Sequence, residues 1–115
     1  MKILNFKSVS PLFEMERNGE KPFTTRKVDS KDKRFRALSQ WQPQFKWGIR
    51  LINPATGENF IREIVAVSYL RYFDLRQDDI GKGQAAFYDW RIIVMGELLE
   101  GLDGQRTEKT IGKSL

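Results

Sequence analysis

The chain contains neither cysteine nor histidine among its 115 residues. Without cysteine it has no disulfide framework, no thiol nucleophile and no zinc–thiolate site. Without histidine, a Ser-His-Asp triad, the usual zinc hydrolase ligands and histidine acid–base catalysis are excluded as well. Only carboxylates remain as metal ligands, and the adjacent pair Asp78 and Asp79 is a poor cage for an ion. We therefore expect no metal site and no cofactor.

Long hydrophobic runs are also missing. No window approaches twenty apolar residues, as a transmembrane helix would require. The first residues, Met1 to Phe6, alternate polar and apolar side chains and contain no signal-peptide core. We therefore expect a cytoplasmic protein with no membrane partner. At 40% apolar residues, the composition predicts one soluble globular domain with a modest core.

Positive charge is in excess, and the excess lies in the first third of the chain. The net charge is +5, and residues 1–36 hold ten Lys and Arg against five acids, whereas residues 37–115 hold ten of each. Residues 26–36 alone carry six basic and two acidic side chains. A localised basic segment concentrates phosphate groups and indicates a polyanion partner such as RNA. The alternative is a solvated loop of mixed charge.

The N-terminal residues predict a strand, a helix and a second strand. Residues 2–7 have the pattern of a short strand. Ser10 as a hydroxyl cap and Pro11 at the first helical position predict the start of a helix of two turns. Gly19 ends that helix, because glycine adopts the left-handed conformation favoured at helix C-termini. Residues 22–28 contain strand formers and predict an extended segment.

The middle of the chain predicts a loop followed by a β-hairpin. Residues 29–44 form a long polar connection with turn and breaker residues, and loops of this length tend to be functional or mobile. Residues 45–52 and 60–70 predict two strands joined by a turn at 53–58. Because the second strand alternates imperfectly, we expect a bulge or burial on both faces, as in a small barrel.

The last third is harder to assign. Residues 71–86 are polar and predict a loop with a helical turn. Phe87 and Trp90 begin a run with helical spacing, but the run is also rich in strand formers, and we favour a closing strand over 87–99. Residues 101–115 contain several glycines and polar residues and predict a flexible tail.

A motif lies between the predicted helix and the second strand. Gly19, Lys21, Thr24 and Arg26 form the pattern G-x-K-x-x-T-x-R. In this setting the pattern resembles the ASCH domain family of the PUA-like superfamily, whose motif is G-x-K-x-x-[T/E]-x-R. The resemblance covers eight residues as a motif and roughly residues 2–70 as an order of elements. It implies an α+β, mainly β fold: a small PUA-like β-barrel with one or two short helices over residues 1–100, in which the basic connection at about 28–44 is an insertion.

The residue types of the motif suit ligand binding. Gly19 permits a tight passage from helix to strand and a close backbone approach to a ligand. Thr24 and Arg26, two residues apart, share one face of a strand, and Lys21 fits the turn before it. An ammonium, a hydroxyl and a guanidinium in one cleft would bind a phosphate, a carboxylate or a base edge. The alternative is that the two cations are surface residues and Thr24 is a strand former.

The resemblance implies that the chain binds RNA or a nucleotide-like ligand in this cleft. The basic segment would then hold phosphates, and the aromatic residues after it would stack on bases, although a small barrel also needs such side chains in its core. The predicted nucleic-acid-binding residues are Lys27, Lys31, Lys33, Arg34, Arg36, Trp41 and Trp47, with Phe35 and Phe45 as further stacking candidates.

Two alternatives remain open. Some ASCH-like proteins are acetylcytidine amidohydrolases, which implies catalytic roles for Lys21 and Thr24 and a carboxylate that handles protons; other family members are reported as ribonucleases. That carboxylate is unassigned here. Asp74, Asp78 and Asp79 lie in the region where it is expected, and Glu58 and Glu63 lie on the predicted hairpin.

The second alternative is a small phage or mobile-element protein that acts only through a protein partner. It predicts an exposed apolar patch around Trp41, Trp47 or the pair Tyr72 and Phe73, and no open polar cleft. The sequence leaves the oligomeric state open.

Overall fold

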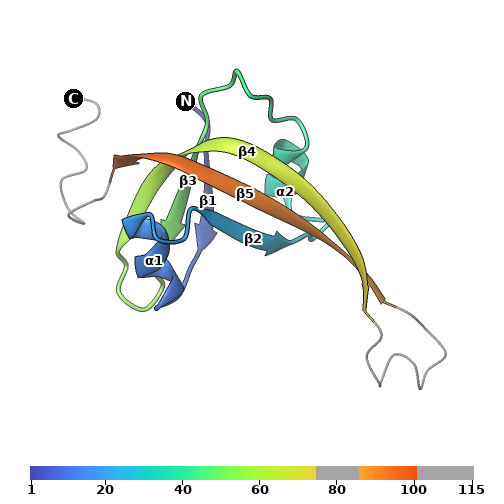
Figure 1. The fold of residues 1–115 in the computed structure, drawn as a ribbon, viewed down its shortest axis with the longest axis horizontal. Coiled ribbons are helices and arrows are strands. Elements are labelled where there is room, and N and C mark those ends of the chain that lie inside the picture. The colour runs from blue at the N-terminus through green and yellow to red at the C-terminus, as the bar shows by residue number, and fades with distance from the viewer. Residues whose placement is uncertain (75–85, 101–115) are drawn as a thin grey trace.

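The computed structural model describes residues 1–74 and 86–100, and the side chains of 1–71 and 89–100 within them. It is a mainly β domain with five strands and two short helices (Figure 1). Along the chain these are β1 (Ile3–Lys7), α1 (Leu12–Asn18), β2 (Phe23–Lys27), α2 (Lys33–Leu38), β3 (Gly48–Ile52), β4 (Asn59–Asp74) and β5 (Ala86–Glu100). The predicted α+β, mainly β class is confirmed.

The five strands form one curled sheet in the order β1-β3-β4-β5-β2. β1 runs parallel to β3, and all other neighbours are antiparallel. The curl gives a half-barrel whose two edge strands, β1 and β2, come close together. Arg26 of β2 reaches the backbone of β1, where its Nη1 donates to the Lys7 carbonyl at 2.7 Å. β1 and β2, the two edge strands of the sheet, are therefore joined by this side-chain hydrogen bond.

Helix α1 packs one face into the core and ends where the sequence predicts. Phe13 is fully buried and contacts Phe60, with ring centroids 5.3 Å apart. Gly19 follows the helix at φ +86°, in the left-handed region that favours glycine. The predicted start is wrong by one residue: the N-cap is Pro11, and the Ser10 hydroxyl donates to Glu14 instead of capping the helix.

Helix α2 lies inside the segment that the sequence predicts to be a loop. Its N-cap is Asp32, whose side chain accepts the Arg34 backbone N–H at 2.9 Å. Phe35 and Leu38, three residues apart, are 7% and 0% exposed and join the core. The basic connection therefore contains a helix that is held by its apolar face and carries its charges outside.

The hairpin of β3 and β4 is confirmed, and register shifts between Ile61 and Ala66 give the predicted irregularity in its long strand. The closing strand is confirmed as β5. Strands β4 and β5 also continue into the residues predicted as a polar loop, and pair as far as Asp74 and Ala86. A loop with a helical turn was predicted over residues 71–86, and its residues 75–85 lie outside the described part of the chain, as does the tail predicted at 101–115.

The core lies inside the curl of the sheet and under both helices. It is formed mainly by aliphatic and phenylalanine side chains from every element except β2, including Leu4, Phe13, Leu38, Ile49 and Ile93. Within residues 1–74 and 86–100, no helix is long and apolar enough to cross a membrane.

Candidate ligand-binding site

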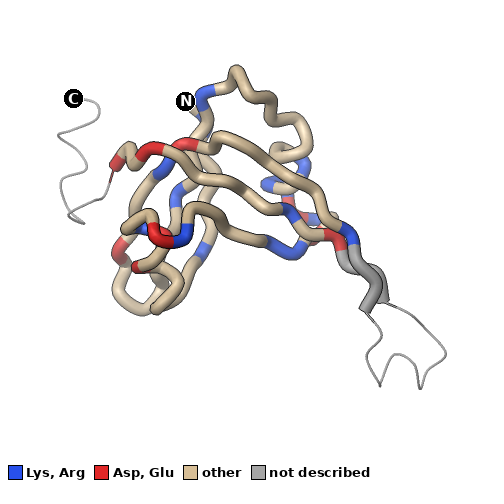
Figure 2. Tube along the Cα trace, in the orientation of Figure 1, with Lys and Arg blue, Asp and Glu red and all other residues tan. Residues whose placement is uncertain are grey.

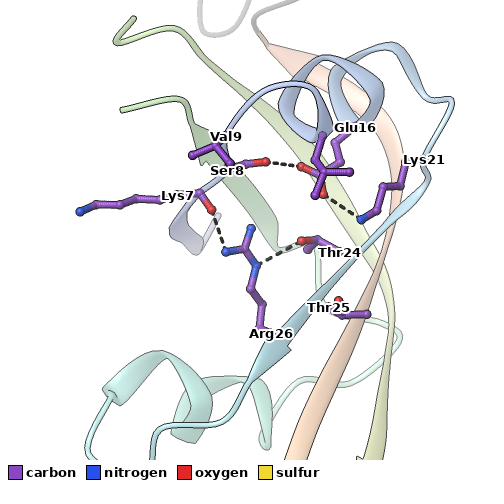
Figure 3. Close-up of a pocket in the computed structure, with 9 residues that line it drawn as sticks. Lys7, Ser8, Val9, Glu16, Lys21, Thr24, Thr25 and Arg26 are labelled. Carbon is purple, nitrogen blue, oxygen red and sulfur yellow. Dashed lines mark hydrogen bonds and ion pairs between the residues drawn. The ribbon is translucent and has the colours of Figure 1, made fainter. Parts of the chain in front are cut away.

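A pocket of about 280 Å³ opens between the two edge strands, beside the start of α1 (Figure 3). We call it the first pocket. Its walls come from the end of β1, the chain leading into α1, α1 itself and β2. The lining residues are Lys7, Ser8, Val9, Leu12, Glu16, Lys21, Thr24, Thr25 and Arg26. Three of the four motif residues are among them.

A buried carboxylate lies at the back of the first pocket. Glu16 is 2% exposed, and both its oxygens have partners: the Ser8 hydroxyl donates to Oε1 at 2.6 Å, and the Lys21 ammonium donates to Oε2 at 3.0 Å (Figure 3). These bonds offset the cost of removing a charge from water. No role was predicted for this residue from the sequence. Its position three residues after the buried Phe13, on the same helix face, was the available signal.

Lys21 precedes β2, in the turn where the sequence predicts it. Besides Glu16 it binds the Phe23 carbonyl at 2.7 Å, and its ammonium lies 4.6 Å from the centroid of the Phe23 ring. The lysine is thus held in place by an anion, a carbonyl and an aromatic face. Its side chain is 19% exposed and is one of the pocket walls.

Thr24 and Arg26 share one face of β2, as their spacing predicts. The Arg26 Nε–H donates to the Thr24 hydroxyl oxygen at 3.1 Å, and its Nη1 donates to the Lys7 carbonyl. Burial lowers the pKa of Arg26, with an opposing contribution from Glu16 and a further lowering by Arg34. The guanidinium nevertheless stays charged at neutral pH. Among the described residues, no hydrogen bond uses its Nη2 group.

Gly19 does not line the first pocket. It ends α1 at positive φ, and a Cβ placed there would lie 3.4 Å from the Arg62 guanidinium. That guanidinium donates to three carbonyls, those of Glu16, Arg17 and Gly96. Gly19 therefore shapes the end of the helix, and the expected close approach to a ligand is not its role in this pocket.

A second pocket of about 380 Å³ adjoins the first on the α2 side of β2. It is lined by Phe6, Thr25, Arg26, Lys27, Asp29, Asp32, Arg34 and Phe35, so Thr25 and Arg26 belong to both pockets. Arg34 is fixed here by Asp32, whose two oxygens accept its Nε–H at 3.0 Å each, and by the Asn5 carbonyl. These bonds hold the pKa of Asp32 below its usual value.

The other residues predicted to bind nucleic acid lie at different places in the structure. Lys31, Lys33 and Arg36 are exposed near or on α2 and line neither pocket. Figure 2 shows Lys and Arg gathered around α2 and the end of β2, and acids around α1 and the end of β5. The predicted aromatic platform is partly wrong, because the buried Phe35 packs edge-on against Phe6, at 5.9 Å between centroids.

Trp41 and Trp47 are partly buried and pack against the core. Trp47 stacks on Phe45 with centroids 5.4 Å apart, and Lys2 lies over its ring. Neither tryptophan lines the two pockets. Their large side chains fill space beside the sheet, which is the alternative role that the sequence analysis left open.

The candidate catalytic carboxylates of the hairpin lie elsewhere. Glu58 faces Arg17 and Glu63 faces Lys46, each at 3.9 Å. The Asp74 side chain and residues Asp78 and Asp79 lie outside the described part of the chain. Across the described residues, no three acidic side chains gather in a way that would hold a metal ion.

Comparison with known proteins identifies no family for this chain. No protein-family model matches the chain, and no match is found among curated proteins or solved structures.

Proposed function

We propose that this protein is a PUA-like barrel of the ASCH type that binds RNA or a nucleotide-like ligand in the first pocket. One observation carries the proposal: Lys21, Thr24 and Arg26, which belong to a single eight-residue motif, line one pocket between the edge strands. The pocket is slightly smaller than typical small-molecule sites, but its apolar wall and few convergent polar groups match their composition.

The free hydrogen-bonding groups of the pocket are mainly donors. Thr24 is 2% exposed, and its oxygen accepts from Arg26, so its O–H remains as a donor on the pocket wall. The Nη2 group of Arg26 adds further donors. The carboxylate of Glu16 is already bound by Ser8 and Lys21. Such a site favours ligand acceptors, for example phosphate oxygens or the carbonyl groups of a base.

A polynucleotide would extend from the pocket over the basic surface beside it. Lys27 and Arg34 line the second pocket, and three exposed cations lie on or next to α2. Each phosphate that a single strand places against a cation contributes about 0.7 to the salt slope of binding. The exposed cations are Lys31, Lys33 and Arg36.

The test is the affinity for short single-stranded RNA, measured by fluorescence anisotropy over a series of salt concentrations. Wild-type protein is compared with Arg26→Gln and with Lys46→Gln, an exposed lysine at the start of the hairpin that lines neither pocket. Loss of a hydrogen bond to a charged group is worth roughly 1.5–3 kcal/mol. Arg26→Gln should therefore weaken binding by about tenfold or more and lower the salt slope, while Lys46→Gln changes affinity little.

The proposal is wrong if RNA binding at low salt is absent, or if a correctly folded Arg26→Gln variant binds as wild type does. Circular dichroism and thermal unfolding of each variant establish that the fold is retained. Double-stranded RNA and DNA oligonucleotides of the same sequence identify the preferred strand type.

A second candidate function, hydrolysis of an acetylated cytidine, is favoured by one contact. The Lys21 ammonium lies 3.0 Å from the carboxylate of Glu16, so an amine and a carboxylate are adjacent beside Thr24. This carboxylate comes from α1, and not from the region after the long strand that the resemblance implies. Incubation with N4-acetylcytidine tests the candidate: hydrolysis lost in both Lys21→Arg and Glu16→Gln would support it, and no turnover by wild type would remove it.

A further inference from the structure

The two pockets meet at β2 but differ in chemistry. The first has an apolar wall from Val9 and Leu12, which are 57% and 44% exposed, and its buried carboxylate is paired internally. The second contains three cations, Arg26, Lys27 and Arg34. Because Thr25 and Arg26 line both, one ligand can lie across β2 with an apolar part on one side and an anionic part on the other.

The two arginines of the second pocket are held in position before any ligand arrives. The guanidinium carbons of Arg26 and Arg34 lie 5.1 and 4.1 Å from the centroid of the same Phe6 ring. Each arginine also donates to a carbonyl of β1, at Lys7 and at Asn5 respectively. Because both guanidiniums are fixed against one ring, the protein loses little side-chain entropy when an anion binds to them.

The two carboxylates of the second pocket already have partners within the protein. One Asp29 oxygen accepts the Lys31 backbone N–H at 3.0 Å. Asp32 is engaged by the backbone and the guanidinium of Arg34. The lining holds three cations and two carboxylates, and exposed basic residues follow on α2. A phosphate group fits this balance, because its oxygens accept several N–H bonds at once.

We propose that the two pockets are the halves of one nucleotide site, in which the first pocket takes the base and the second takes the phosphate, with Arg26 between them. This inference rests on the proposed function and narrows it from RNA or a nucleotide-like ligand to a phosphorylated nucleotide. A nucleoside fills only the first pocket, and inorganic phosphate fills only the second.

The experiment measures three ligand types on the intact protein by isothermal titration calorimetry at low salt. These are the four ribonucleosides, their 5′- and 3′-monophosphates, and inorganic phosphate. For the preferred base, we expect at least one monophosphate to bind about tenfold or more tightly than the nucleoside. Inorganic phosphate should compete with the monophosphate and leave nucleoside binding unchanged.

Arg34→Gln tests whether the phosphate binds in the second pocket, because Arg34 lines that pocket only. It should remove most of the gain from the phosphate without changing the affinity for the nucleoside, whereas Lys46→Gln, which also removes one positive charge, should leave the gain intact. Arg34→Lys keeps the charge and should retain part of the gain. If Arg34→Gln loosens α2, the inference is tested with Arg34→Lys and with the wild-type affinities for nucleoside and monophosphate.

The failures of the two proposals are distinguishable. Equal affinity for nucleoside and monophosphate, or a phosphate gain that survives Arg34→Gln, overturns the two-part site while the proposed function stands. If neither nucleosides, monophosphates nor short RNA bind at low salt, both are wrong. Phosphate that binds equally well to Arg34→Gln and wild type is a surface anion and contradicts the inference.

Discussion

The first pocket and the basic helix α2 are neighbours with opposite relations between charge and structure. In the first pocket the charges are inside: Glu16 is 2% exposed and is bound by Lys21 and Ser8. In α2 the apolar residues Phe35 and Leu38 are inside, and most charges lie outside. From the sequence alone, a place on the surface was the alternative for the two cations of the motif, and a loop was predicted where α2 lies.

The contrast between buried and exposed charges indicates which of them are available to a ligand. A buried ion pair with good partners is part of the fold, and removing one member leaves an uncompensated charge. An exposed cation contributes little to stability and is available to attract phosphate. Arg26 combines both roles, since its Nε and Nη1 are used inside the protein and its Nη2 faces no described partner.

The largest effect is expected in the core face of α2. Leu38→Ala removes a fully buried side chain, and such substitutions cost about 2–5 kcal/mol. The matched control, Arg36→Ala, lies on the exposed face of the same helix and should stay within about 0.5 kcal/mol of wild type. Urea unfolding measures both. Equal, small effects would mean that α2 is a mobile basic loop after all.

The second-largest loss of stability is expected at the ion pair of the first pocket. Lys21→Met leaves the Glu16 carboxylate buried without its cation, and we expect a loss of unfolding free energy on the order of 3 kcal/mol. The double variant Lys21→Met with Glu16→Gln no longer buries a charge, so it should lose less than the sum of the two single variants. An additive double-mutant cycle would show that the two groups are not coupled.

A smaller effect is expected at the cap of α2. Because Arg34 lowers the pKa of Asp32 in the folded protein, the unfolded chain takes up its proton first as pH falls. The stabilisation is thus present above the ordinary carboxyl pKa of about 3.9 and is lost in more acidic solution. For this partly exposed pair it is at most about 1 kcal/mol. Asp32→Asn should lose that amount at pH 7 and show a weaker acid dependence, measured by urea unfolding at pH 7 and pH 3.

The smallest effect on stability, with a separate effect on binding, is expected for the outer face of α2. Arg36→Gln should unfold as wild type does, while its salt slope for single-stranded RNA falls by about 0.7 if that residue meets one phosphate. An unchanged slope would remove Arg36 from the phosphate-binding surface and leave the pockets untouched.

Local signals predicted a large part of the fold. The order of β1, α1 and β2, the hairpin of β3 and β4, and the closing strand β5 follow from caps, alternation and β-forming residues. The parallel pairing of β1 with β3 was not predicted, because it depends on contacts between residues more than forty positions apart. Helix α2 was missed because its three charged residues hid the spacing of Phe35 and Leu38, although Asp32 was a usable N-cap signal.

The candidate site was predicted in part. The motif predicted Lys21, Thr24 and Arg26 as site residues. The pocket that they share could not be predicted, because it depends on how the two edge strands approach each other. Glu16 was missed because carboxylates on an amphipathic helix are mostly exposed, and only the position of Phe13 indicated that this face is buried. The tryptophans were candidates for stacking because aromatic residues near basic ones suit both a nucleic-acid surface and a core.

The central claim is that a nucleotide ligand binds at the gap between β1 and β2. Its most direct test is the change in backbone amide chemical shifts of isotope-labelled protein as a short single-stranded RNA is added. We predict that the largest shifts occur in residues 7–9 and 21–27, with smaller ones around α2. Shifts concentrated at residues 45–47 or 69–71, with the gap between the edge strands unchanged, would contradict the account.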